Sequence, residues 1–232
     1  MALSHGPSPI ITNGLVLCLD AADRNSYPGS GTTWTDLSGN GNNGTLVNGV
    51  GFDSANGGSL VFDGVNDYCN LTNNSNFSLG SSYFTVECWV YPTSYASGAG
   101  FQEGRTVIGK WNTEGGEKGW RIDINTSNIV WYTDGTVIHT TPISLNVWTH
   151  IVATGNGTNT SFYKNGVLVS GPTSNNWTDT STKQLIVGAL LFGSYAYYYS
   201  GRISNTRIYK GKEFSSAEIQ QNFNALRGRF NI

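Results

Sequence analysis

The chain has 232 residues, a formal net charge of −2 at pH 7 and only 12% charged residues, about half of the usual share. Lysine and arginine are scattered singly, so the sequence lacks the clustered positive charge by which proteins bind nucleic acids or anionic membrane surfaces. It also contains no run of about 18 apolar residues. We therefore expect no nucleic-acid partner and no membrane span.

The N-terminal segment and the cysteines bear on where the protein works. Residues 1–9, MALSHGPSP, are predicted to form a flexible arm without the apolar segment of a signal peptide, and residues 10–232 a single domain. Cys18, Cys69 and Cys88 each lie in an apolar, strand-like stretch, so buried free thiols are expected. This combination predicts cytoplasmic synthesis followed by a location on a virion or outside the cell.

Short alternating apolar runs, separated by Gly, Asn and Asp clusters, recur along the chain as they do in β-sandwiches. Asn165-Gly166 between SFYK and VLVS predicts a two-residue hairpin turn, because both residues tolerate a positive φ. The predicted strands are Leu15–Asp20, Ser59–Phe62, Asp67–Leu71, Phe84–Tyr91, Thr106–Lys110, Trp120–Asn125, Ile129–Thr133, Thr149–Thr154, Ser161–Lys164, Gln184–Val187 and Gly201–Tyr209.

Two further segments predict how the layers are covered. In Phe84–Tyr91 neither alternating face is purely polar, which indicates a central strand covered on both sides or one that lines a concave face. Near the C-terminus, Ser215 and Glu218 have the spacing of a capping box ahead of an apolar helical face. A short terminal helix is therefore expected to dock on the sandwich.

An ordered series of motifs spans residues 14–220. It contains GLVLCLDAAD, TWTDLSGNGNNGTL, LVFDGVNDYCNL, FTVECWVYP, VIGKW, GWRIDI, NVWTHIVATGNGTNTSFYKNGVLV, LIVGA and GRISNTRIYKGKEFSSAEI. In this order the motifs resemble laminin-G-like domains of the concanavalin A-like lectin/glucanase superfamily. The resemblance implies an all-β, two-sheet antiparallel jelly-roll sandwich, with a short C-terminal helix and with the first and last strands as neighbours.

Glucanases of this fold carry two glutamates flanking an aspartate on one strand, E-x-D-x-E, because retaining hydrolysis needs two carboxylates about 5–5.5 Å apart. The corresponding segment here, residues 120–124, contains only Asp123. Glu114 and Glu117 lie in a Gly-rich loop rather than at strand spacing. His139 and His150 are isolated in sequence, and a structural role is expected for His150. We therefore expect no enzymatic activity.

Carboxylates near strand ends supply a candidate metal site. Asp20, Asp23, Asp63 and Asp67 offer the hard oxygen ligands that Ca²⁺ prefers. Calcium sites recur in laminin-G-like domains, so the resemblance favours a structural calcium ion. No other cofactor is expected. The alternative is that these side chains satisfy their own turn backbones. The terminal strand is uncharged where related domains often carry an acid, which counts against calcium.

Aromatic residues supply a candidate sugar-binding surface, because the C–H faces of sugars stack on aromatic rings. In FGSYAYYYSG an extended backbone would place Tyr195, Tyr197 and Tyr199 on one side. Trp111 and Trp131 are the other candidate ligand-binding residues. The alternative is that these rings pack between the sheets or against a neighbouring subunit.

Together these features favour a non-catalytic, carbohydrate-recognising or adhesive domain, as a component of a virion such as a phage tail or capsid surface. The alternative is a capsid or tail decoration or assembly protein that binds no glycan, since a fold does not fix a function. A glycoside hydrolase is the least favoured class. The expected partners are a cell-surface glycan, a virion structural protein or further copies of the chain.

Overall fold

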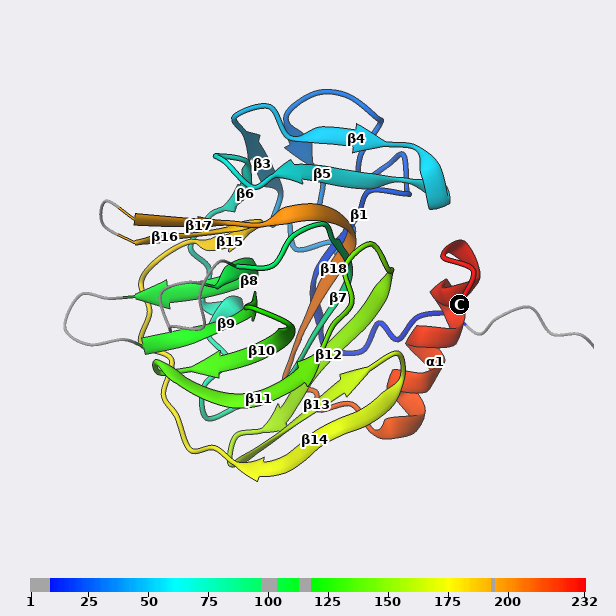
Figure 1. Ribbon diagram of the computed structural model, residues 1–232. Coiled ribbons are helices and arrows are strands. Elements are labelled where there is room, and N and C mark those ends of the chain that lie inside the picture. The colour runs from blue at the N-terminus through cyan, green and yellow to red at the C-terminus, as the bar shows by residue number, and fades with distance from the viewer. Residues whose placement is uncertain (1–8, 97–103, 113–117, 193–194) are drawn as a thin grey trace, which may run out of the picture.

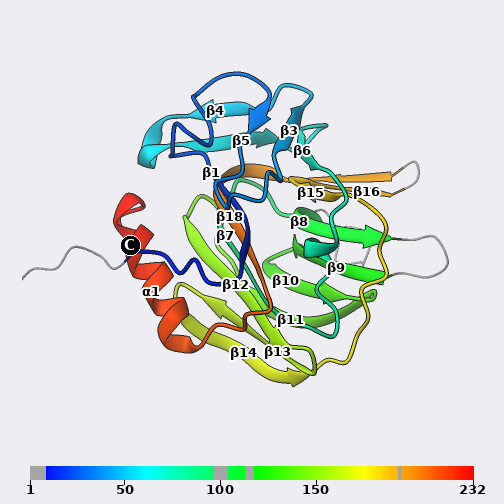
Figure 2. The same cartoon turned by 180° about the vertical axis from the view of Figure 1, so that it is seen from behind.

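Two antiparallel sheets pack face to face in the computed structural model, which describes residues 9–96, 104–112, 118–192 and 195–232 (Figures 1 and 2). Sheet A has the order β14 (Val167–Ser174), β13 (Asn159–Lys164), β12 (Thr149–Asn156), β7 (Tyr83–Pro92), β18 (Ser200–Lys210), β5 (Ser59–Asp63) and β4 (Gly51–Asp53), with β1 (Leu15–Asp20) also paired to β18. Sheet B has the order β11 (Thr136–Pro142), β10 (Asn128–Thr133), β9 (Lys118–Ile124), β8 (Arg105–Asn112), β15 (Leu185–Val187), β6 (Tyr68–Leu71), β3 (Gly44–Val47) and β2 (Thr33–Trp34).

Smaller elements connect and cover the sheets. β16 (Ala189–Phe192) and β17 (Tyr195–Tyr198) form a separate two-stranded ribbon. The helices are α1 (Ser216–Leu226) and three short 3₁₀ turns, η1 (Ala55–Gly57), η2 (Ser75–Phe77) and η3 (Arg227–Arg229). The predicted strands are confirmed with shifts of one or two residues at their ends, and the all-β jelly-roll sandwich with a C-terminal helix is confirmed with them.

The long strand β18 organises sheet A. One of its edges pairs with β7, with a register shift between Ile203 and Asn205, while the other pairs first with β5 and then with β1. The first and last strands of the sheet are therefore neighbours, as expected. The hairpin between β13 and β14 is also confirmed, because Asn165 and Gly166 have φ values of 51° and 79°, both in the left-handed region.

The main core lies between the sheets. Alternation along β7 turns Phe84, Val86, Cys88 and Val90 inward, where they belong to the same buried cluster as Trp120 of β9. All three cysteines are buried and unpaired, as predicted. Burial raises the pKa of the Cys88 thiol to about 12, which keeps it protonated and unreactive at neutral pH.

Helix α1 covers the outer face of sheet A, which completes the burial of β7 on both sides (Figure 1). Trp89 of β7 stacks on Phe223 and Phe230, with ring centroids 5.7 and 4.2 Å apart. The helix begins with the predicted capping box, in which Ser215 accepts from the Glu218 amide and Glu218 accepts from the Ser215 amide. A strand with two apolar faces is thus explained by a helix at the far end of the chain.

Charged residues are buried beneath this helix. Arg207 of β18 donates to Glu87 Oε1 at 3.1 Å and to Asp20 Oδ2 at 3.3 Å. Asp20 also accepts from Arg229 at 2.9 Å, and Asn222 of α1 donates to both oxygens of Glu87 at 3.1 Å. Each carboxylate therefore has cationic or amide partners, as buried charges require.

The two described histidines are structural. His150 Nε2 lies 3.4 Å from Glu87 Oε2, and its ring stacks on Trp89 at 5.0 Å. His139 joins the edges of the two sheets, since its ring nitrogens lie 2.8 Å from Ser170 Oγ and 2.9 Å from Thr160 Oγ1. Neither side chain is exposed to solvent.

Candidate functional site

The outer face of sheet B carries a separate small cluster of Trp111, Val130, Tyr132 and Leu190, outside the main core. Along β9 and β10 the strand alternation sends Trp120, Ile122 and Trp131 into the core. The alternate residues Arg121 and Tyr132 therefore lie on the opposite face. This face differs from its counterpart on sheet A, because no helix of the described part of the chain packs on it.

An arginine held between two rings forms the floor of this face. The guanidinium carbon of Arg121 lies 4.6 Å from the centre of the Trp111 ring and 4.4 Å from that of Tyr132. Its Nε donates to Asp123 Oδ2 at 2.6 Å, and Thr106 donates to the other Asp123 oxygen at 2.7 Å. These contacts fix the position of the two rings, because every group in the stack has a buried partner.

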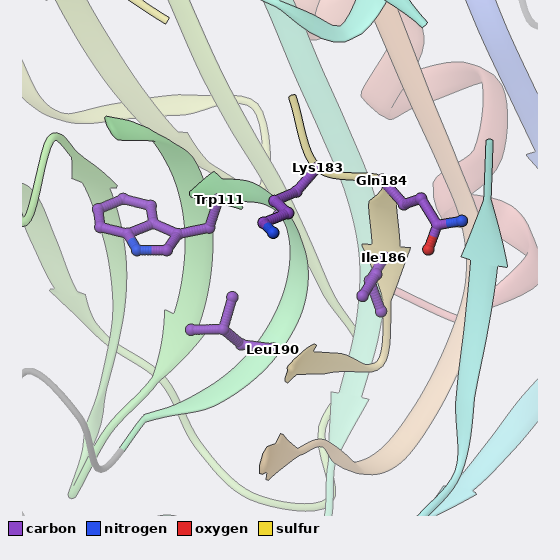
Figure 3. A pocket seen from close by; sticks show the side chains of 6 residues that line it. Trp111, Lys183, Gln184, Ile186 and Leu190 are labelled. Atoms are coloured by element: carbon purple, nitrogen blue, oxygen red, sulfur yellow. The ribbon is translucent and has the colours of Figure 1, made fainter. Parts of the chain in front are cut away.

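A pocket of about 130 Å³ opens beside this stack (Figure 3). Trp111 of β8, Ile186 of β15 and Leu190 of β16 supply its apolar wall, and Lys183 and Gln184 supply polar groups. Figure 3 shows the Lys183 amine directed toward the side of Trp111, whereas the Gln184 amide points the other way. The pocket thus combines an apolar wall with an ammonium group, which together suit a polar ligand that has an apolar face.

Of the five predicted ligand-binding residues, Trp111 and Tyr197 lie together at this pocket, whereas Trp131 and Tyr199 lie in the core. Trp111 belongs to a buried cluster against which Tyr197 of β17 packs, beside the pocket. Trp131 is fully buried and stacks on Trp120 and Phe84 in the core. Its ring is closed to any ligand at the surface of this structure.

The expected row of three tyrosines is divided. β17 ends at Tyr198, and the Tyr199 amide donates to the carbonyl of Gly188, which turns the ring inward against Phe62. Tyr199 is fully buried and does not share a surface with Tyr197. The backbone of Tyr195 pairs with Phe192, and its side chain lies outside the described part of the structure. The sequence does not mark Lys183, Gln184 and Leu190 as site residues, since single residues in loops and short strands give no periodic signal.

The predicted calcium ligands lie in two different settings. Asp20 is occupied by Arg207 and Arg229, and Asp23 accepts from the backbone and side chain of Asn25 in its own loop. Both oxygens of Asp20 and Oδ1 of Asp23 therefore already accept hydrogen bonds. Among the described residues, no group of three or more His, Cys, Asp or Glu side chains is arranged around a common metal position.

The turn between β5 and β6 fits a cation better. Asp63 Oδ1 accepts from the Val65 amide at 2.7 Å, and this hydrogen bond lowers the pKa of Asp63. Asp67 Oδ2 accepts from the Asp63 amide, while its buried Oδ1 has no hydrogen-bond partner. Burial raises the pKa of Asp67. The calcium ion stays a prediction, with Asp63 and Asp67 as the residues that would hold it.

Comparison with known proteins agrees with this architecture. The sequence profile of the concanavalin A-like lectin/glucanases superfamily matches residues 63–220, more than half of the chain, and the chain belongs to this superfamily. A search of curated protein sequences gives no match. No helix in the described ranges is long and apolar enough to cross a membrane.

Solved structures share the fold at low sequence identity. A Trypanosoma rangeli sialidase mutant with trans-sialidase activity has a TM-score of 0.73 at 16% identity, over 96% of this chain and 34% of that chain. The binding domain of Paraclostridial Mosquitocidal Protein 1 has a TM-score of 0.68 at 18% identity, over 92% and 52%. The botulinum neurotoxin serotype G binding domain has 0.66 at 18%, over 90% and 50%. The chain therefore spans between about a third and a half of these proteins.

Proposed function

We propose that this domain binds carbohydrate through the outer face of sheet B and does not catalyse a reaction. The observation that carries the proposal is the pocket beside the Trp111–Arg121–Tyr132 stack, with Lys183 and Gln184 at its edge. The apolar wall of the pocket packs against the apolar face of a sugar, while the Lys183 ammonium group binds its hydroxyls. The lectin-like scaffold and the toxin binding domains that share it support this proposal.

The hydrogen bonds that Asp123 accepts support a non-catalytic role. Asp123 is the only carboxylate on β9, and its two oxygens are engaged by Arg121 and Thr106. A retaining glycosidase needs one carboxyl as acid and a second one free to attack. Glu114 and Glu117, the other acids of this region in sequence, lie outside the described residues.

A glycan array tests the proposal, with binding to the best hit then measured by calorimetry. Lys183→Ala and Tyr197→Ala are expected to weaken binding by at least about 10-fold, equivalent to about 1.4 kcal/mol, with unchanged melting midpoints. Tyr83→Ala, which removes an exposed tyrosine of sheet A, is the matched control and should bind like the wild type. Turnover of any bound glycan would contradict the non-catalytic role.

A second candidate function is assembly, in the setting of a virion, without glycan binding. It is favoured by β14, the end strand of sheet A, which exposes three consecutive apolar side chains, Val167, Leu168 and Val169. Exposed apolar edge strands pair readily with other chains. Silence across the glycan array, together with stable oligomers in light scattering, would favour this second function and overturn the first.

A further inference from the structure

A second pocket, of about 250 Å³, lies at the β4 end of sheet A. It forms between the loop that follows β1 and the segment that joins β4 to β5, and it shares no lining residue with the pocket of sheet B. Figure 1 places β4 at the top of the molecule, well away from β8 and β9. The two pockets can therefore be altered independently.

One wall of this second pocket is aromatic. The ring centroids of Tyr27 and Phe52 lie 5.4 Å apart, with the planes tilted by 51°. Tyr27 is buried and donates its hydroxyl to the carbonyl of Gly31, which fixes the ring. Phe52 is 36% exposed on the end strand of the sheet. A phenyl ring supported from behind and open to solvent in front offers a stacking surface.

The pocket is also lined by a positively charged side chain that has no ion pair among the described residues. Arg24 is the only charged side chain that lines it, and it is exposed, with no hydrogen bond or ion pair to the described residues. The nearby acids are engaged elsewhere: Asp53 pairs with Arg202 at 3.0 Å, and Asp20 pairs with Arg207 and Arg229. Asp23 directs Oδ1 to Asn25. Arg24 is thus left to bind an anionic group from solution.

We propose that this pocket binds a single sugar unit that bears a carboxylate, such as a uronic acid. The guanidinium of Arg24 matches a carboxylate in two-point geometry, which a lysine cannot reproduce. The Phe52 ring stacks on the apolar face of the sugar, and Ser54 at the edge supplies a hydroxyl for hydrogen bonding. The volume is just below the range of pockets for drug-sized ligands, which suits a smaller ligand such as a single sugar unit.

Titration of ¹⁵N-labelled protein with glucuronate and with glucose tests this site. Glucuronate is expected to shift the amides of Arg24, Phe52 and Ser54 and to bind at least about 10-fold more tightly than glucose. Arg24→Ala and Phe52→Ala should each weaken glucuronate binding by a similar factor, and Arg24→Lys should restore only part of it.

The controls separate this site from the pocket of sheet B. Arg227→Ala and Tyr83→Ala remove an exposed arginine and an exposed aromatic ring elsewhere, and neither should alter glucuronate binding. Lys183→Ala should also leave it unchanged, whatever the outcome for the proposed function. Equal affinity for glucose and glucuronate, shifts confined to residues outside the pocket, or no saturable shift would each overturn the proposal.

Discussion

Buried charged residues have different roles on the two outer faces of the sandwich. On sheet A, Glu87, Arg207 and Asp20 lie under helix α1 and hold it to the sheet through Asn222 and Arg229. On sheet B, the pair Arg121–Asp123 lies under aromatic rings beside a pocket. The first arrangement holds a helix on its sheet, whereas the second lies under a buried cluster of rings with a pocket at its edge. A buried ion pair therefore does not by itself indicate a functional site.

The charge network of sheet A is expected to give the largest effect on stability. Arg207→Met would leave the carboxylates of Glu87 and Asp20 buried with fewer partners, so the free energy of unfolding should fall by about 3–5 kcal/mol. Urea denaturation measures this change. Arg202→Met on the same strand is the matched control, because Arg202 pairs with Asp53 in a third-exposed position and should cost at most about 1 kcal/mol. Equal losses in the two variants would contradict the structural role assigned to Arg207.

Acid is expected to lower the free energy of unfolding through Glu87 of sheet A, by a smaller amount than the Arg207 substitution does. Burial favours the protonated form of Glu87, but the hydrogen bond from His150 and the charge of Arg207 outweigh it and hold the pKa at about 2. Because this value is below the usual 4.5, the contribution of Glu87 is complete above pH 4.5 and is lost as the pH falls toward 2. We expect a loss on the order of 3 kcal/mol across this window, measured by urea denaturation at each pH.

Glu87→Gln provides the control for this titration. The variant should be less stable than the wild type at pH 7, and its stability should fall less steeply between pH 4.5 and pH 2. Parallel pH profiles for the two proteins would show that other carboxylates govern the acid sensitivity.

The sandwich was predictable from sequence because its signals are local and repeated. The alternation in β7, the Asn165-Gly166 turn and the Ser215 capping box each specify backbone geometry within a few residues. The strands that the sequence pattern does not predict, such as β4 and β11, are short or carry few buried side chains. They form because neighbouring strands offer free edges, which is a tertiary effect.

The candidate sites were much less predictable. Trp111 and Tyr197 were identified from residue type, but the same reasoning selected Trp131 and Tyr199, which lie in the core. Residue type cannot distinguish these cases, because the inward turn of Tyr199 depends on a backbone contact with Gly188 across the end of the ribbon. Lys183 reaches the pocket only because β15 lies beside β8.

The smallest effect on stability is expected at the turn that holds Asp63 and Asp67. It concerns two buried carboxylates, Asp20 and Asp67, that differ in their partners. Asp20 is held by two arginines, whereas Asp67 has an oxygen without a partner and no paired cation among the described residues. A calcium ion would supply the missing charge, and millimolar Ca²⁺ should then raise the melting midpoint relative to EDTA by a few degrees, as linkage requires. Asp67→Asn should abolish the shift, while Asp23→Asn should preserve it. A midpoint that is the same in Ca²⁺ and EDTA would contradict calcium binding and leave the hydrogen bond to Asp63 as the role of this carboxylate.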